Sequence, residues 1–64
     1  MTTLNSSAIQ AAGYDPSLQE MTIQFTSGGT YTFYRVPEEI FHGLITAASP
    51  GSFYHAYIRG RYGP

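Results

Sequence analysis

The stretch MTIQFTSGGTYTFYRVP, residues 21–37, decides the fold. Apolar and polar residues alternate over 21–25, which is typical of a β-strand with one buried face. The Ser-Gly-Gly sequence at 27–29 is typical of a hairpin turn. The β-branched and aromatic run over 30–36 favours a returning strand, and Pro37 then ends the sheet. The stretch predicts an antiparallel hairpin.

The register of this hairpin has two alternatives, because the turn can contain two or three residues. A three-residue Ser-Gly-Gly loop pairs Phe25 with Tyr31 and Ile23 with Phe33. Tyr31 and Phe33 then face the core. A two-residue turn shifts the pairing by one and places Tyr31, Phe33 and Arg35 on the opposite face. That face would carry an exposed aromatic stripe, which would mark a binding or self-association surface. The sequence leaves both alternatives open.

The remaining elements follow from local signals. Residues 7–12 form a possible short strand before a turn at Gly-Tyr-Asp-Pro. Pro37 is well placed as the first residue of a helix, and Ser49 followed by proline predicts a second short helix that ends at Gly60. We expect one α+β domain over residues 1–64, with a small antiparallel sheet of two to three strands followed by two short helices packed on one face.

The composition narrows the class of function. Ten of the 64 residues are Tyr or Phe, only seven are charged, and none is lysine. A net charge of −1 and a pI near 6.0 disfavour a diffuse electrostatic grip on nucleic acid. Without cysteine, and with only two histidines, the sequence offers no metal site. It also lacks a signal peptide and a long apolar run, so we expect a cytoplasmic protein.

The aromatic and arginine residues predict a ligand site. His55, Arg59 and Tyr62 are spaced to share one face of the last helix, where arginine supplies a bidentate fork for phosphate and tyrosine a stacking face. The alternative is a solvated helix end whose arginines complement the helix dipole. The predicted ligand-binding residues are Tyr31, Phe33, Arg35, Tyr54, His55, Arg59, Arg61 and Tyr62.

Catalysis has little support in the sequence. No nucleophile motif surrounds the serines, and the adjacent Glu38 and Glu39 would point to different faces of a helix. Gly28 and Gly29 lie between two strands, whereas phosphate-binding loops usually lead into a helix. We expect a protein that is not an enzyme and binds no cofactor.

Several short motifs resemble the KTSC domain, a small module found at the C-terminus of some lysyl-tRNA synthetases and as free-standing proteins. The matching residues are Ser7-x-Ile9, Gly13-Tyr14-Asp15, Phe25-Thr26-Ser27-Gly28, Val36-Pro37, Ser49-x-Gly51-x-Phe53-Tyr54 and Ile58-Arg59. The Tyr-x-Tyr pair of the family corresponds here to Tyr31-Thr32-Phe33, which lacks the second hydroxyl. The resemblance covers nearly the whole chain and implies an RNA-binding role; family members often carry basic residues at positions that are Thr, Gly or Ser here.

Three functions follow from these patterns. The first is an oligomeric binder of a compact nucleotide-type phosphate ligand, with the site at a subunit interface because so small a fold cannot enclose a ligand alone. Such a protein could sequester a signal nucleotide, as a phage antagonist of host defence would. The second is a module that contacts single-stranded RNA or tRNA. The third is a protein-interaction adaptor that uses the open face or edge of the sheet.

Overall fold

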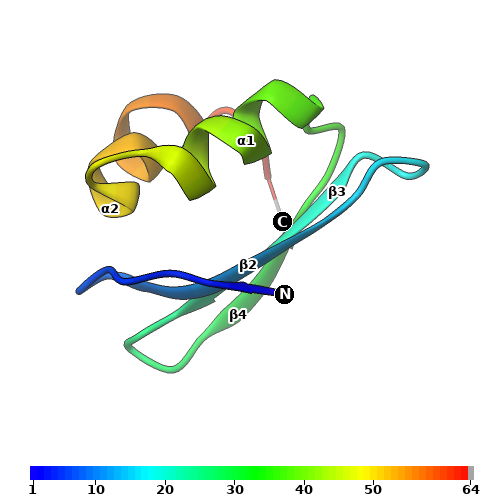
Figure 1. Ribbon diagram of the computed structural model, residues 1–64. Coiled ribbons are helices and arrows are strands. Elements are labelled where there is room, and N and C mark those ends of the chain that lie inside the picture. The colour runs from blue at the N-terminus through cyan, green and yellow to red at the C-terminus, as the bar shows by residue number, and fades with distance from the viewer. Residues whose placement is uncertain (64) are drawn as a thin grey trace.

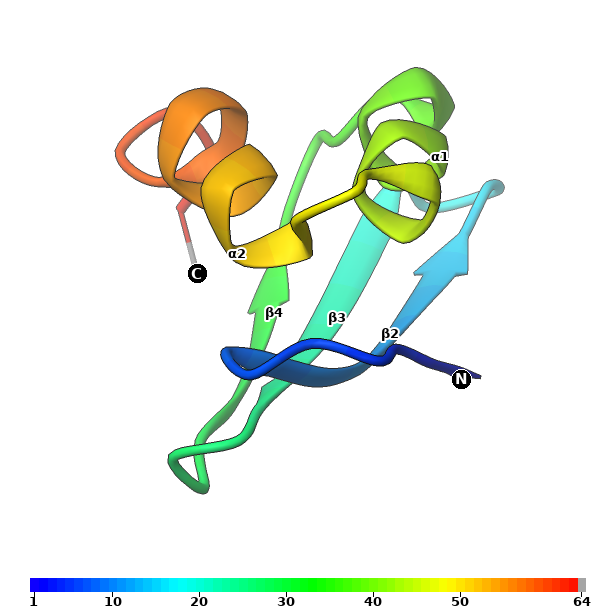
Figure 2. The same ribbon diagram turned by 60° about the vertical axis from the view of Figure 1, so that its left-hand side comes forward.

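The computed structural model describes residues 1–63 as a twisted antiparallel sheet with all helices on one of its faces (Figures 1 and 2). The strands are β1 (Thr2–Thr3), β2 (Ile9–Asp15), β3 (Glu20–Phe25) and β4 (Thr30–Phe33), and the helices are α1 (Glu38–Thr46), α2 (Pro50–Phe53) and the π-helical turn η1 (Tyr54–Ile58). The predicted α+β class, with the helices packed on one face, is confirmed. The predicted number of two to three strands is wrong, because the described residues form four strands in the order β1-β2-β3-β4.

The short strand β1 accounts for the difference in strand number, and β2 is also longer than expected. Thr2 and Thr3 pair with Ala12 and Ala11. A strand of two polar residues is too short to give a recognisable pattern in the sequence. β2 continues through Asp15, which pairs with Glu20, so the predicted turn begins later and occupies residues 16–19.

The hairpin between β3 and β4 has a register that neither alternative described. Met21 pairs with Phe33 and Ile23 with Tyr31, two residues away from the pairing of Ile23 with Phe33 expected for the Ser-Gly-Gly loop. The three-residue loop is instead Thr26-Ser27-Gly28, closed by hydrogen bonds between Phe25 and the glycines that follow. A shift of two residues preserves the face of every side chain. Tyr31 and Phe33 therefore lie on the helix-covered face, as the three-residue alternative predicted.

The helices begin within one residue of their predicted starts. Pro37 precedes the first residue of α1, one position from its predicted place inside the helix. The Ser49 hydroxyl accepts a hydrogen bond from the backbone N–H of Ser52, and Pro50 is the first residue of α2. η1 continues directly from α2 and ends before Gly60, whose φ of +79° suits a glycine.

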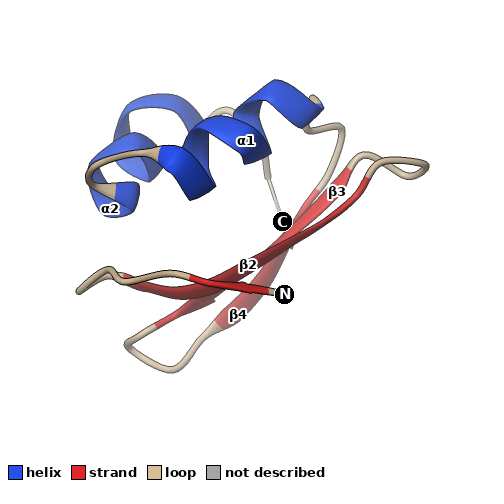
Figure 3. Ribbon diagram, viewed as in Figure 1, coloured by secondary structure: helices blue, strands red, loops and turns tan. Residues whose placement is uncertain are grey.

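The hydrophobic core lies between the helices and the sheet, as the two layers in Figure 3 indicate. Its buried members are Ile9, Ala12, Met21, Ile23, Phe33, Val36, Leu44 and Ile58. Half-buried aromatic residues surround this core, which is how so small a domain supplements a limited interior. None of the helices that the structure describes has the length and apolar character needed to cross a membrane.

Candidate functional site

Four aromatic residues form a continuous contact network between the hairpin and η1. We call Phe25, Tyr31, Phe33 and Tyr54 the sheet-side aromatic cluster. The ring centroids of Phe25 and Tyr31 are 5.8 Å apart, and Tyr54 lies 5.1 Å from Phe25 and 6.1 Å from Phe33. All three pairs are edge-to-face, an arrangement that the charge distribution of aromatic rings favours.

The sheet-side aromatic cluster runs from the core to the surface. Phe33 is only 3% exposed, whereas Tyr31 is 50% exposed. Phe25 and Tyr54 are half-buried between them. The buried end fixes the orientation of the cluster, and the Tyr31 ring is available to a ligand or a partner.

The absence of a side chain at Gly29 leaves room for the Tyr31 ring. A Cβ atom on Gly29 would lie 2.6 Å from Tyr31 Cε2 and 2.9 Å from the hydroxyl oxygen, so the ring leans along the strand over this glycine. Any larger residue at this position would push the ring outward. The second glycine of the Gly-Gly pair therefore positions an aromatic side chain, while Gly28 provides the positive φ of the turn.

A histidine–arginine pair adjoins the sheet-side aromatic cluster on η1. The ring centroids of His55 and Tyr54 are 5.6 Å apart, and Arg59 Nη1 lies 3.3 Å from His55 Nδ1. Because guanidinium only donates, Nδ1 accepts this hydrogen bond and a neutral ring carries its proton on Nε2. Both residues are exposed. Together they present N–H donors suited to an anion beside an aromatic surface.

Five of the eight predicted residues are thus brought together. These are Tyr31, Phe33, Tyr54, His55 and Arg59. Phe25, which was not among the predicted site residues, links Tyr31 to the rest of the cluster. The three-residue alternative already placed Phe25 beside Tyr31, but the contact of Phe25 with Tyr54 joins distant parts of the chain and has no local pattern in the sequence.

The other three predicted residues are placed elsewhere. The expected shared face of His55, Arg59 and Tyr62 is wrong at Tyr62, because the helix ends at Ile58 and Gly60 turns the chain. Tyr62 is half-buried and packs against the core. Among residues 1–63, no hydrogen bond or ring contact joins Arg35 or Arg61 to the sheet-side aromatic cluster.

Arg35 has an unusual backbone conformation. Its φ is +57°, in the left-handed region that non-glycine residues seldom adopt. The hydrogen bond from Val36 N–H to the Gln19 carbonyl oxygen fixes the chain immediately after it. The bend turns the chain from β4 toward α1, and the Arg35 side chain is exposed.

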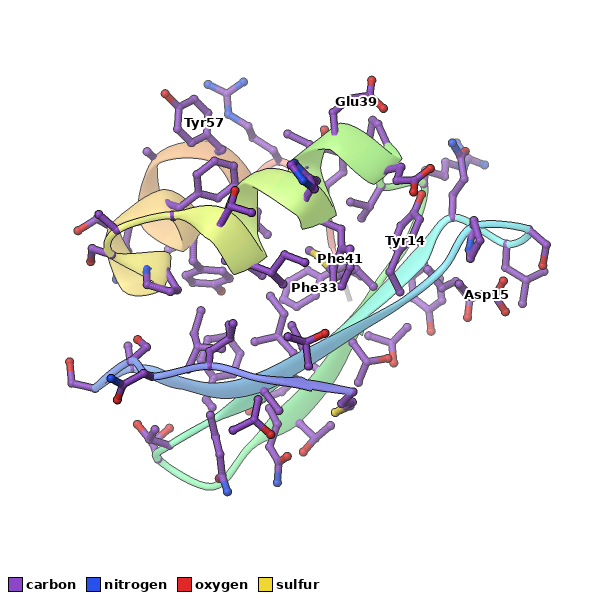
Figure 4. All side chains as sticks on the ribbon, viewed as in Figure 1. Tyr14, Asp15, Phe33, Glu39, Phe41 and Tyr57 are labelled. Carbon is purple, nitrogen blue, oxygen red and sulfur yellow. The ribbon has the colours of Figure 1, made fainter. Side chains whose placement is uncertain are left out.

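A second aromatic region lies at the other end of the sheet. Tyr14 and Phe41 stack with ring centroids 5.3 Å apart and planes 15° from parallel, and Figure 4 shows them between β2 and α1. The Tyr14 hydroxyl donates a hydrogen bond to the Val36 carbonyl oxygen. Burial raises the pKa of Tyr14 above its ordinary value, and the charges of Glu38, Glu39 and Asp15 raise it further.

Asp15 has the opposite shift. The hydroxyl of Ser17 donates a hydrogen bond to the Asp15 carboxylate and lowers its pKa, and the backbone N–H groups of Leu18 and Ser17 add to this effect. These bonds close the turn after β2. Asp15 therefore has a structural role in the turn.

A third feature is a shallow hollow on α1. Glu38, Glu39, His42 and Gly43 line it. The Phe53 ring lies against Gly43 and also packs on Tyr57 at 4.7 Å. Tyr57 is 52% exposed and points away from the sheet (Figure 4). The described residues include no group of three or more His, Cys, Asp and Glu that could hold a metal ion.

Comparison with known proteins shows what the chain resembles. Residues 5–62 match the KTSC domain. A free-standing protein of Tsukamurella paurometabola is 45% identical over 62 residues, which cover 97% of this chain and 92% of that protein. A lysine–tRNA ligase of Nostoc is 36% identical over 56 residues, which cover 88% of this chain but only 10% of the ligase.

A solved structure has the same fold. The crystal structure of a KTSC domain protein from Yersinia pestis superimposes with a TM-score of 0.93 and 35% sequence identity. The match covers 97% of this chain and 87% of that chain. The Tsukamurella protein and the Nostoc ligase likewise each contain a region similar to most of this chain.

Proposed function

The chain belongs to the KTSC domain family, and we propose that it is a non-enzymatic, self-associating module that binds a compact nucleotide-type phosphate ligand in the cytoplasm. The observation that carries this proposal is the continuity from the sheet-side aromatic cluster to the His55–Arg59 pair. A planar base stacks on the exposed Tyr31 or the half-buried Tyr54, and a phosphate accepts hydrogen bonds from Arg59 and His55. A signal nucleotide that is sequestered, as in phage counter-defence, is one ligand of this class.

The small size of the cationic site supports a compact ligand. The chain has three arginines and no lysine, and among residues 1–63 Arg59 is the arginine that bonds to a residue next to the aromatic cluster. One guanidinium can bind one or two phosphate groups in a bidentate manner. It cannot neutralise a long polyanion.

The test is a titration with mono-, di- and cyclic nucleotides, with inorganic phosphate as a reference probe. We expect one nucleotide class to bind, and we expect Arg59→Ala to abolish its binding. Arg35→Ala removes the same charge from a residue outside the cluster and serves as the matched control. Equal affinity of Arg59→Ala and the wild type would contradict the assignment of the phosphate to Arg59.

Single-stranded RNA or tRNA is the second candidate ligand. The similarity to a region of lysine–tRNA ligases favours it, and aromatic stacking contributes roughly 1–3 kcal/mol per base. A polymer that contacts several phosphates loses affinity steeply with salt, with a slope of about −0.7 per phosphate for single strands. A shallow salt dependence with a mononucleotide, together with weak oligonucleotide binding, supports the compact ligand.

A protein-interaction adaptor is the third candidate. The face of the sheet opposite the helices carries polar residues such as Thr22 and Thr32, whose hydroxyls lie 3.5 Å apart. An adaptor would bind neither nucleotide nor RNA and would retain one specific protein in a pull-down from its host.

A further inference from the structure

The free edge of β4 has a defined pattern of outward-pointing backbone groups. Phe25 donates its N–H to the Gly29 carbonyl oxygen, and residues of an antiparallel strand alternate between pointing toward the partner strand and away from it. The backbone groups of Tyr31 and Phe33 therefore point toward β3, whereas those of Thr30 and Thr32 point outward. The next outward N–H, that of Tyr34, donates to the Gly63 carbonyl oxygen.

The opposite edge of the sheet, formed by β1, has fewer outward-pointing backbone groups than β4. Leu4 donates its N–H to the Gln10 carbonyl oxygen, so by the same alternation only Thr3 points its backbone groups outward within β1. A single outward residue cannot support a ladder. The strand order β1-β2-β3-β4 makes β4 the other edge, where Thr30 and Thr32 both point outward and make no backbone hydrogen bond to another of residues 1–63.

Within Thr30–Phe33 the outer edge of β4 carries no charged side chain, proline or bulge, although the strand is short and Gly63 bonds to Tyr34 just beyond its end. Monomeric proteins protect such edges with lysine, proline, bulges, charged side chains that point inward, very short strands or a covering loop. β4 has the sequence Thr-Tyr-Thr-Phe and pairs with β3 without a register shift. Tyr31 in its centre is 50% exposed. The small net charge of −1 adds little repulsion between two copies.

We propose that β4 pairs antiparallel with β4 of a second copy of this chain, with the two-fold axis at Tyr31. In this register Thr30 lies opposite Thr32 of the second copy, and Thr32 lies opposite Thr30. Their outward N–H and carbonyl groups then form four hydrogen bonds across the axis. The two four-stranded sheets become one continuous sheet. This pairing deepens the proposed self-association by naming its surface and rests on that part of the proposed function.

The neighbouring registers fit less well. Centring the axis on Thr32 would place Thr30 opposite Tyr34, whose N–H already bonds to Gly63. Centring it on Thr30 would place Thr32 opposite Gly28, which lies in the turn and has a φ of +112°. Only the axis at Tyr31 uses both outward residues and preserves the contact with Gly63.

The same register brings together the exposed ends of the two sheet-side aromatic clusters. The two Tyr31 residues lie opposite each other on the helix-covered face, at a non-hydrogen-bonded position where side chains are close. Each ring leans over Gly29, which lies opposite Phe33 of the second copy. The two aromatic clusters thus meet at the axis and form one surface shared by both subunits.

The test places proline at an outward-pointing residue on each edge of the sheet and compares the two variants. Thr32→Pro removes an outward N–H from β4, and proline is tolerated at such edge positions. Thr3→Pro makes the matched change on β1. Sedimentation equilibrium without nucleotide is expected to give twice the mass of 7.0 kDa for the wild type and Thr3→Pro, and a single copy for Thr32→Pro.

Amide hydrogen exchange of the wild type tests the same surface without any substitution. The amides of Thr30 and Thr32 are expected to become protected as the protein concentration rises, while that of Thr3 stays exchangeable. A wild type that is monomeric at every concentration, or a dimer that Thr3→Pro disrupts and Thr32→Pro leaves intact, would overturn the pairing. Both readouts are independent of ligand, so the pairing can fail while nucleotide binding succeeds, and the reverse.

Discussion

Two aromatic pairs at opposite ends of the sheet use similar residues in different ways. Tyr14 and Phe41 stack nearly parallel, and the Tyr14 hydroxyl bonds to a backbone carbonyl. Tyr31 and Phe25 meet edge-to-face, and the Tyr31 ring is half exposed beside a glycine. The first pair joins α1 to β2 and stabilises the fold. The second leaves a half-exposed ring available for recognition and is expected to contribute less to stability, so surroundings rather than residue type separate the two roles.

The largest difference is expected on truncating the ring in the first pair. Phe41→Ala removes a half-buried ring that stacks on Tyr14 and packs against the core. Since full burial of such a ring makes the change cost about 3–5 kcal/mol, we expect a loss of about 2–3 kcal/mol in the free energy of unfolding. Urea denaturation measures it. A loss no larger than that for Tyr31→Ala would contradict the distinction between the two pairs.

A smaller effect is expected on removing only the hydroxyl of the first pair. Tyr14→Phe keeps the ring but leaves the Val36 carbonyl without its hydrogen bond, so the variant is less stable at neutral pH. Because the pKa of Tyr14 is raised in the fold, the folded wild type binds more protons than the unfolded chain just above pH 10.0. Its stability therefore falls as the pH rises through that range, and Tyr14→Phe lacks this contribution.

The measurement for Tyr14 is the urea midpoint on both sides of pH 10.0. Tyr34→Phe removes an exposed hydroxyl and is the matched control. If Tyr14→Phe lost stability in alkali as steeply as the wild type and Tyr34→Phe, the hydroxyl would not be the source of the pH dependence.

The comparison also shows where sequence reasoning works. The alternation around Ile23, the proline before α1 and the Ser49 cap depend on local physics, and each was predicted near its observed position. The proximity of His55 and Arg59 followed from helical spacing. These features need no information from distant parts of the chain.

The features that were missed depend on choices that the local sequence leaves open or on contacts between distant residues. The hairpin contains two adjacent glycines, which fit more than one loop; in the observed loop Gly28 has a positive φ and Tyr31 packs over Gly29. Tyr62 was placed on a helical face because the spacing continued past the actual helix end at Ile58. The stack of Tyr14 on Phe41 joins residues 27 positions apart, for which no local pattern exists.

The smallest effect on stability is expected in the second pair. Tyr31→Ala removes a half-exposed ring at the edge of the sheet, and surface changes of this kind usually cost less than about 1 kcal/mol. Gly29→Ala should displace the same ring without removing it, since the added Cβ would meet the mobile end of Tyr31. Both variants should retain nearly the wild-type urea midpoint, but both should weaken nucleotide binding because the stacking surface is lost or moved. If either variant unfolded at much lower urea, the Tyr31 ring would be a structural residue like Phe41, and its exposure would not mark a recognition surface.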